Sequence, residues 1–144
     1  MGEIRVSAER DVAAPAEVVR ELLTDYARRP RFLTENYTDF GVDEGGAGAG
    51  TAFHYTFRAG RRVRGYRMRV EETPDGALVE RDTGSSLVTT WRVTPAGPGS
   101  RVRVETSWTG GSGVGGFFER TFAPGALRRV YEQVLARLAQ AAGR

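Results

Sequence analysis

Glu80 is the acidic residue of this 144-residue chain that is best placed to do chemistry. Leu78, Glu80 and Asp82 alternate along a short run with strand character, so all three face the same side of a sheet. If that side is the apolar one, the carboxyl group of Glu80 is desolvated and can serve as a general acid or base. The alternative is a carboxylate at a strand end that pairs with an arginine, for which Arg10 and Arg81 are the candidates.

Tyr55 and Tyr66 fall on the apolar sides of two other alternating runs. We predict that these two tyrosines join Glu80 as the catalytic residues. The predicted ligand-binding residues are the large or polar side chains on the inward faces, together with two phenylalanines ahead of the last helix: Tyr55, Tyr66, Met68, Thr89, Trp91, Thr106, Trp108, Phe118 and Phe122. Buried tyrosine and tryptophan need hydrogen-bond partners, which a polar ligand or water can supply. The alternative is that these residues fill a small core with their polar tips at its rim.

The residue types that are missing exclude several kinds of chemistry. The chain has no cysteine, which excludes disulfides and thiolate metal sites, and one histidine, which excludes a multi-histidine metal site. All 21 basic residues are arginine, so lysine Schiff-base catalysis is excluded as well. We predict no metal site and no cofactor. The single histidine, His54, alternates with Phe53 and Tyr55, which take the inner face, so we expect His54 on the outer surface.

A glycine-rich segment, residues 110–116, precedes the last helix and raises the question of phosphate binding. It lacks the Lys-Ser/Thr pair of a nucleotide-binding loop and does not follow a parallel strand. We predict instead a flexible loop at the mouth of a pocket, with Phe117 and Phe118 as a hydrophobic gate.

Arginines are densest between residues 58 and 69. The apolar pattern changes phase between Val63 and Tyr66, which predicts a bulge at Gly65 that keeps both side chains inward. The arginines then form either a solvated outer face interleaved with acids or a docking surface for an anionic partner, such as an acyl-carrier protein or nucleic acid. Because the formal net charge is only +3, we predict no nucleic-acid binding.

The elements that position these residues follow from their periodicity. We predict a strand over 3–12, a helix that opens at Pro15, a short second helix over 31–36 after Pro30, and alternating strands from 37 to 110 with a turn at 73–76. A helix over 117–142, interrupted or kinked at Pro124, carries an apolar stripe of Leu127, Val130, Tyr131, Val134, Leu135 and Leu138. The result is one α+β domain over 1–144, with a strongly bent antiparallel sheet of six to seven strands around a long C-terminal helix.

Two absences bear on where the protein works. The chain has no apolar run of the roughly 20 residues that cross a bilayer, and residues 1–5 have no apolar signal-peptide core. We therefore expect a cytoplasmic protein without a membrane span. The pattern leaves the oligomeric state open.

This order of elements resembles the helix-grip fold of the START and birch-pollen-allergen-like superfamily (SRPBCC), in particular its bacterial polyketide cyclase/dehydrase group. The segments that carry the resemblance cover nearly the whole chain: residues 11–19 (DVAAPAEVV), 70–74 (VEETP) followed by Leu78-Val79, 91–95 (WRVTP), and the glycine-rich lead into the last helix. One departure is Arg20, where the family often has an aromatic residue.

The resemblance implies a pocket between the sheet and the last helix that binds an apolar or aromatic small molecule, polyketide-like or lipid-like. It leaves two functions open. One is a polyketide cyclase or aromatase, in which confinement of a reactive chain supplies much of the rate and acid or tyrosine residues move protons. The other is a non-catalytic carrier or sensor of an apolar metabolite.

Overall fold

The elements of the chain follow the predicted order. The computed structural model describes residues 3–109 and 124–143. Strand β1 (Glu3–Val12) leads into helix α1 (Ala16–Thr24) and the 3-10 helix η1 (Tyr26–Arg31). The later elements are β2 (Tyr37–Glu44), β3 (Ala52–Ala59), β4 (Arg62–Glu72), β5 (Leu78–Asp82), β6 (Val88–Ala96), β7 (Gly99–Thr109) and α3 (Pro124–Ala142).

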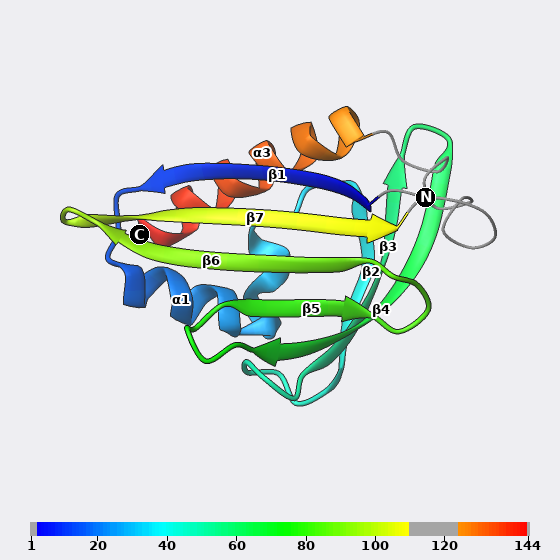
Figure 1. The fold of residues 1–144 in the computed structure, drawn as a ribbon, viewed down its shortest axis with the longest axis horizontal. Helices are drawn as coiled ribbons and strands as arrows, with labels where there is room; N and C mark the ends of the chain where they lie inside the picture. Colours follow the sequence, from blue (N-terminus) through cyan, green and yellow to red (C-terminus); the bar gives the residue numbers. More distant parts are fainter. Residues whose placement is uncertain (1–2, 110–123, 144) are drawn as a thin grey trace.

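The seven described strands form one antiparallel sheet in the order β1-β7-β6-β5-β4-β3-β2. Neighbours in the sequence are neighbours in the sheet, except that β1 pairs with β7, from Glu3 opposite Thr109 to Val12 opposite Ser100. The sheet is strongly bent, and β2 and β3 run crosswise to β6 and β7 (Figure 1). The sheet is open, with β1 and β2 as its edges, which confirms the predicted helix-grip architecture.

Helix α3 closes the inner face of the sheet. All six residues of its predicted apolar stripe are buried, and the described helix is about 28 Å long at roughly 1.5 Å per residue. Pro124 is the first residue of the described helix, a position where its missing N–H costs no hydrogen bond. The predicted first turns, residues 117–123, lie outside the described residues.

The predicted second short helix over 31–36 is wrong in position. A 3-10 helix forms earlier, at Tyr26–Arg31, with Pro30 inside it. The reason is Asp25, which ends α1 and whose Oδ1 accepts a hydrogen bond from the Ala27 N–H at 3.1 Å, capping a new helix at once. With the helix in this position, Arg29 is a buried residue of the segment.

The predicted bulge at Gly65 is also wrong. Strands β3 and β4 pair without interruption from Ala52 opposite Arg69 to Ala59 opposite Arg62. Val63 therefore lies on the outer face and is 48% exposed. Strict alternation turns Arg64 inward instead, where its Nη2 lies 3.5 Å from Asp82 Oδ2.

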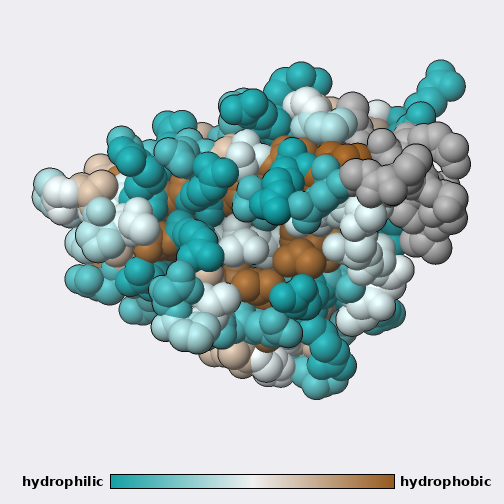
Figure 2. All heavy atoms as spheres, viewed as in Figure 1, coloured by the Kyte–Doolittle hydropathy of each residue, from teal (hydrophilic) through white to brown (hydrophobic). Residues whose placement is uncertain are grey.

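The outer face of the sheet is largely hydrophilic, as the alternation predicts (Figure 2). Arginines there pair with acids on neighbouring strands: Arg101 with Asp11 at 2.8 Å and Arg103 with Glu9 at 3.2 Å. His54 lies on this face, as predicted, and its Nδ1 is 2.9 Å from Asp43 Oδ1. None of the helices in the described ranges has the length and apolar character to cross a membrane.

Candidate functional site

Two small cavities lie between the sheet and α3, each with room for about one water molecule, about 20 Å³. The first is lined by Arg29, Leu33, Tyr37, Phe40, Phe53, Tyr55, Glu80, Thr89, Trp91 and Tyr131. The second is lined by Tyr37, Tyr55, Phe57, Tyr66, Leu87, Leu127 and Tyr131. Three tyrosines, Tyr37, Tyr55 and Tyr131, line both cavities, so the two cavities are neighbours.

Glu80 is buried at the polar end of the first cavity. Strand β5 alternates as predicted and turns this carboxylate inward, where it is 4% exposed. The Tyr26 hydroxyl donates to Oε2 at 2.6 Å and the Trp91 indole N–H donates to Oε1 at 3.1 Å. Arg29 Nη2 donates to the same Oε2 at 2.8 Å, which makes a buried ion pair. Both oxygens of the carboxylate are therefore occupied by donors from the protein itself.

Arg29 reaches Glu80 from η1, across the fold. Its guanidinium lies 4.4 Å from the ring centroid of Tyr26 and 5.2 Å from that of Trp91, which are cation–π distances. Burial alone would lower the pKa of Arg29, but the adjacent Glu80 carboxylate outweighs that and raises the pKa. Its Nε is buried and has no hydrogen-bond partner among the described residues.

A second polar chain ties α3 to the sheet. Thr89 Oγ1 on β6 lies 2.7 Å from Thr106 Oγ1 on β7, and Thr106 Oγ1 in turn shares a hydrogen bond with the hydroxyl of Tyr131 on α3. Burial raises the pKa of Tyr131 to about 12. The Tyr131 phenol therefore stays neutral at physiological pH and acts as a fixed polar group in the wall of both cavities.

Tyr37 and Tyr55 differ from the other tyrosines of this region. Their rings are in contact, with centroids 5.2 Å apart, and burial raises the pKa of each well above its usual range. Neither hydroxyl has a hydrogen bond within the described part of the chain. Two desolvated hydroxyl groups beside a cavity are the polar contacts that a bound molecule would complete.

The structure brings part of the predicted site together. Glu80, Tyr55, Thr89 and Trp91 line the first cavity, and Tyr66 lines the second. Other predicted residues are buried on the same inner face but do not line these cavities: Met68, Thr106 and Trp108. Phe118 and Phe122, and the predicted loop gate at residues 110–118, lie outside the described residues.

Sequence reasoning did not include Arg29, Tyr37 and Tyr131 in the site. Tyr131 was visible as part of the apolar stripe of the last helix, where a lone hydroxyl among aliphatic residues is a usable signal. Tyr37 opens a strand whose register with β3 is broken twice, which hides its face. Arg29 sits among other arginines, and nothing in its spacing distinguishes it from them. The arginine partner of Glu80 is Arg29, not Arg10 or Arg81; Arg81 pairs with Glu71 at 3.2 Å.

Comparison with known proteins places the chain among solved structures of this architecture. The KanY protein, solved by NMR, shares 38% identity over all of both chains, with a TM-score of 0.89. The Zhui aromatase/cyclase from a Streptomyces species shares 16% identity over 99% of this chain and 95% of its own, with a TM-score of 0.75. Ginseng major latex-like protein 151 from Panax ginseng shares 10% identity over 97% of each chain, with a TM-score of 0.75.

No curated protein sequence matches the chain. The family model for polyketide cyclase/dehydrase and lipid transport proteins matches residues 3–143, almost the whole length. The resemblance inferred from the sequence is therefore confirmed, and the chain belongs to the polyketide cyclase/dehydrase and lipid transport family.

Proposed function

We propose that this protein binds a flat, oxygen-bearing aromatic or polyketide-like molecule between the sheet and α3. The observation that carries the proposal is a pair of half-buried tyrosines, Tyr37 and Tyr55, which line both cavities and whose hydroxyls have no hydrogen-bond partner in the described part of the chain. A ligand with a carbonyl or phenol oxygen satisfies them, while the surrounding rings bury its apolar surface. Membership of this family also supports a role in binding a hydrophobic ligand.

The space between the sheet and α3 must enlarge before a ligand can bind. Pockets for small molecules usually measure about 300 Å³ or more, whereas each cavity here holds about 20 Å³. Leu33, Tyr37 and Phe40 are half-buried and come from one stretch of chain, at the edge strand β2 and the loop before it. We infer that this stretch moves outward to admit the ligand and joins the two cavities into one.

Glu80 serves this site as a positioning residue. Its two oxygens accept hydrogen bonds from Tyr26, Arg29 and Trp91 and so hold these three side chains in place around the first cavity. The raised pKa values of Tyr37 and Tyr55 keep both phenols protonated at neutral pH. These groups therefore donate hydrogen bonds and do not act as bases.

A second candidate function is polyketide cyclisation or aromatisation, which one observation favours. Neutral hydroxyls held in a desolvated site stabilise negative charge on a developing enolate oxygen, and Tyr55 has such a hydroxyl. Confinement of a flexible chain of ketones between the sheet and α3 would orient the reacting carbons. The same geometry serves a carrier or sensor, which needs binding alone.

The binding proposal is tested with two probes that differ by one oxygen, 2-naphthol and naphthalene. We expect both to bind, and we expect Tyr55→Phe and Tyr37→Phe to weaken 2-naphthol by about fivefold each, since a hydrogen bond contributes about 1 kcal/mol. Naphthalene affinity should not change, because the rings remain. Equal effects on both probes, or no binding of either, would refute the proposal.

The catalytic candidate is tested separately with a thioester of a linear poly-β-ketone. An enzyme would direct the chain to one ring pattern and lose that control in Tyr55→Phe. A carrier would bind the thioester and leave the spontaneous product mixture unchanged. Glu80→Gln is a useful third variant: in a positioning role, it weakens the binding of both naphthalene and 2-naphthol through loss of order in the cavity wall.

A further inference from the structure

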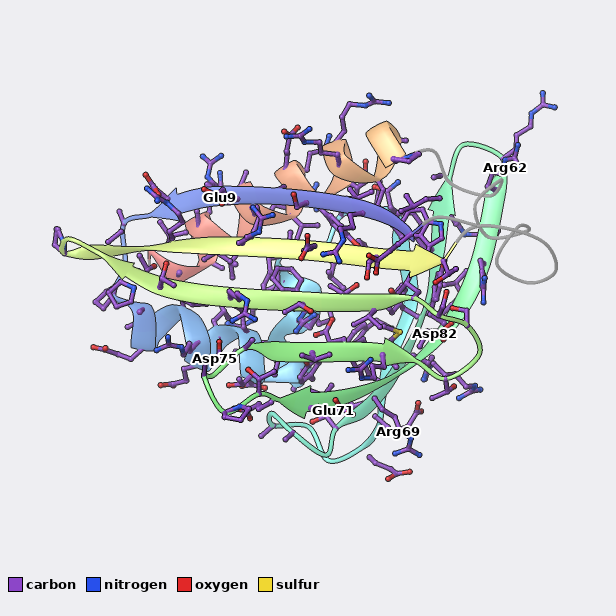
Figure 3. The ribbon with its side chains drawn as sticks, viewed as in Figure 1. Glu9, Arg62, Arg69, Glu71, Asp75 and Asp82 are labelled. Atoms are coloured by element: carbon purple, nitrogen blue, oxygen red, sulfur yellow. The ribbon has the colours of Figure 1, made fainter. Side chains whose placement is uncertain are left out.

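One end of the molecule carries arginines that form no ion pair with any residue that the structure describes. The β3–β4 hairpin, which follows Arg58 on β3 and turns through Gly60, Arg61 and Arg62, presents three guanidinium groups that form no ion pair within the described residues. All three residues are exposed, and Arg62 extends away from the body of the protein (Figure 3). Farther along the same strand, Arg69 pairs with Glu44 at 3.5 Å, so the lack of partners begins at the hairpin.

Helix α3 adds two more arginines near this end. Arg128 and Arg129 lie in its first two turns, are exposed, and also have no ion pair with described residues. The Arg129 side chain extends back toward Gly125, one turn earlier in the helix. The first turn of α3 has no acidic residue.

The hairpin and the start of α3 flank the same cavity. Phe57 and Tyr66 come from the strands next to the hairpin, Leu127 comes from the first turn of α3, and all three line the second cavity. Figure 1 shows the hairpin and the start of α3 toward the same side of the fold. We call Arg58, Arg61, Arg62, Arg128 and Arg129 the cationic end.

The cationic end also has an exposed apolar side chain. Val63 lies opposite Arg58 in the strand register, on the outer face of the hairpin, and is 48% exposed. The base of the hairpin is tied to the loop before β2, because Arg58 N–H donates to Asn36 O and Asn36 Nδ2 donates to Arg58 O, both at 2.8 Å. An exposed valine opposite Arg58, next to a turn that carries Arg61 and Arg62, suits the boundary between lipid headgroups and acyl chains.

We propose that the cationic end docks the protein on an anionic lipid surface, beside the cavity that receives an apolar ligand. The charges provide the attraction, because each arginine close to an anionic bilayer adds a favourable increment. Val63 provides an apolar contact that a soluble polyanion would not use. An apolar ligand dissolves in the bilayer, so a docked protein meets it at high local concentration. The docking surface stands on its own observations and does not depend on the ligand proposed above.

The test is co-sedimentation with lipid vesicles. We expect binding to vesicles of phosphatidylcholine with phosphatidylglycerol, no binding to phosphatidylcholine alone, and a steep loss as salt screens the charges. The triple variant Arg58→Gln, Arg61→Gln and Arg62→Gln should lower the partition coefficient about a hundredfold, from roughly fivefold per arginine. Val63→Ser should weaken binding without changing its salt dependence.

The matched control removes the same formal charge elsewhere, with Arg10→Gln, Arg31→Gln and Arg92→Gln, all exposed and outside the cationic end. It should retain vesicle binding. Equal loss in both triple variants, or equal binding to neutral and anionic vesicles, would overturn the proposal. So would binding to a soluble acidic protein such as an acyl-carrier protein with none to vesicles. The 2-naphthol affinity of the hairpin variant should be unchanged, which keeps this test separate from that of ligand binding.

Discussion

At the residue scale, the interior of this protein contains a buried ion pair between Glu80 and Arg29. Glu80 and Arg29 are almost fully buried, and each compensates the other. The alternation of β5 was enough to predict that Glu80 points inward. It could not predict Arg29 as the partner, because that pairing joins residues 51 positions apart and depends on a 3-10 helix whose start is set by Asp25.

Replacement of one member of this pair should therefore be costly. We expect Glu80→Gln to lower the free energy of unfolding by about 3 kcal/mol, because Arg29 is left buried without a counter-charge. The double variant Glu80→Gln with Arg29→Met should lose less than that. Urea unfolding measures both. As a matched control, Asp75→Asn breaks the exposed pair with Arg92 and should cost less than about 1 kcal/mol; a loss as large as that of Glu80→Gln would contradict this account.

The raised pKa values of the tyrosines predict how the stability of the fold responds to alkaline pH. Burial raises the pKa of all five tyrosines in the chain, that of Tyr131 from 10.0 to about 12. A raised folded-state pKa means that the folded protein holds these protons more tightly than the unfolded chain. Stability from this source is complete below pH 10 and falls as the pH rises above it.

The measurement is phenolate absorbance together with circular dichroism during a titration with base. We expect almost no phenolate near pH 10 and then a cooperative rise that coincides with unfolding. In urea the same chain should titrate smoothly near pH 10. A smooth titration near pH 10 with the fold intact would show that these hydroxyls are hydrated.

At the element scale, the periodicity of apolar residues correctly predicted which side chains face inward. The errors lie at the ends of strands and helices. The stripe of the last helix and the alternation of β6 and β7 were right because each has several consecutive repeats against the core. At the end of β4 the assumption that Val63 must be buried produced a bulge that does not exist. There the register with β3 is unbroken, and strict alternation decides the direction of each side chain.

The hairpin turn gives an element-scale prediction with an internal control. Gly60 has φ 62° and open space around it, whereas Gly65 has open space and an ordinary φ. Gly60→Ala should destabilise the protein by about 1 kcal/mol because alanine is strained in the left-handed region. Gly65→Ala should be neutral or slightly stabilising. Thermal unfolding compares the two, and equal costs would show that strain at the turn is not the cause.

At the scale of the whole molecule, the edge of the sheet at β2 is the least regular part of the wall around the interior space. Strand β2 lies at the sheet edge, and its pairing with β3 is broken between Thr38 and Gly41 and again between Val42 and Glu44. Strands β6 and β7 pair on both sides in regular register. The family and the fold could be read from the sequence, but this irregular edge could not, because broken register leaves no period to detect.

Hydrogen exchange should show this difference directly. We expect backbone amides of residues 37–44 to exchange much faster than those in the middle of β6 and β7, because opening the edge strand breaks one ladder of hydrogen bonds only. Saturation with 2-naphthol should slow exchange over residues 33–44 and leave the middle of β7 nearly unchanged. Uniform exchange along the sheet, or no effect of the probe on this stretch, would place ligand admission elsewhere.

The pairing of β1 with β7 has a consequence for the order in which the protein assembles. Strands β2 to β7 each pair with the next one along the chain, so this meander can form progressively while synthesis proceeds. Strand β1 must wait, because its partners begin at Ser100 and end at Thr109. During translation β1 leaves the ribosome well before its partner β7 and is thus among the last strands to pair, and the closing of this long loop is the slow step that we expect in folding.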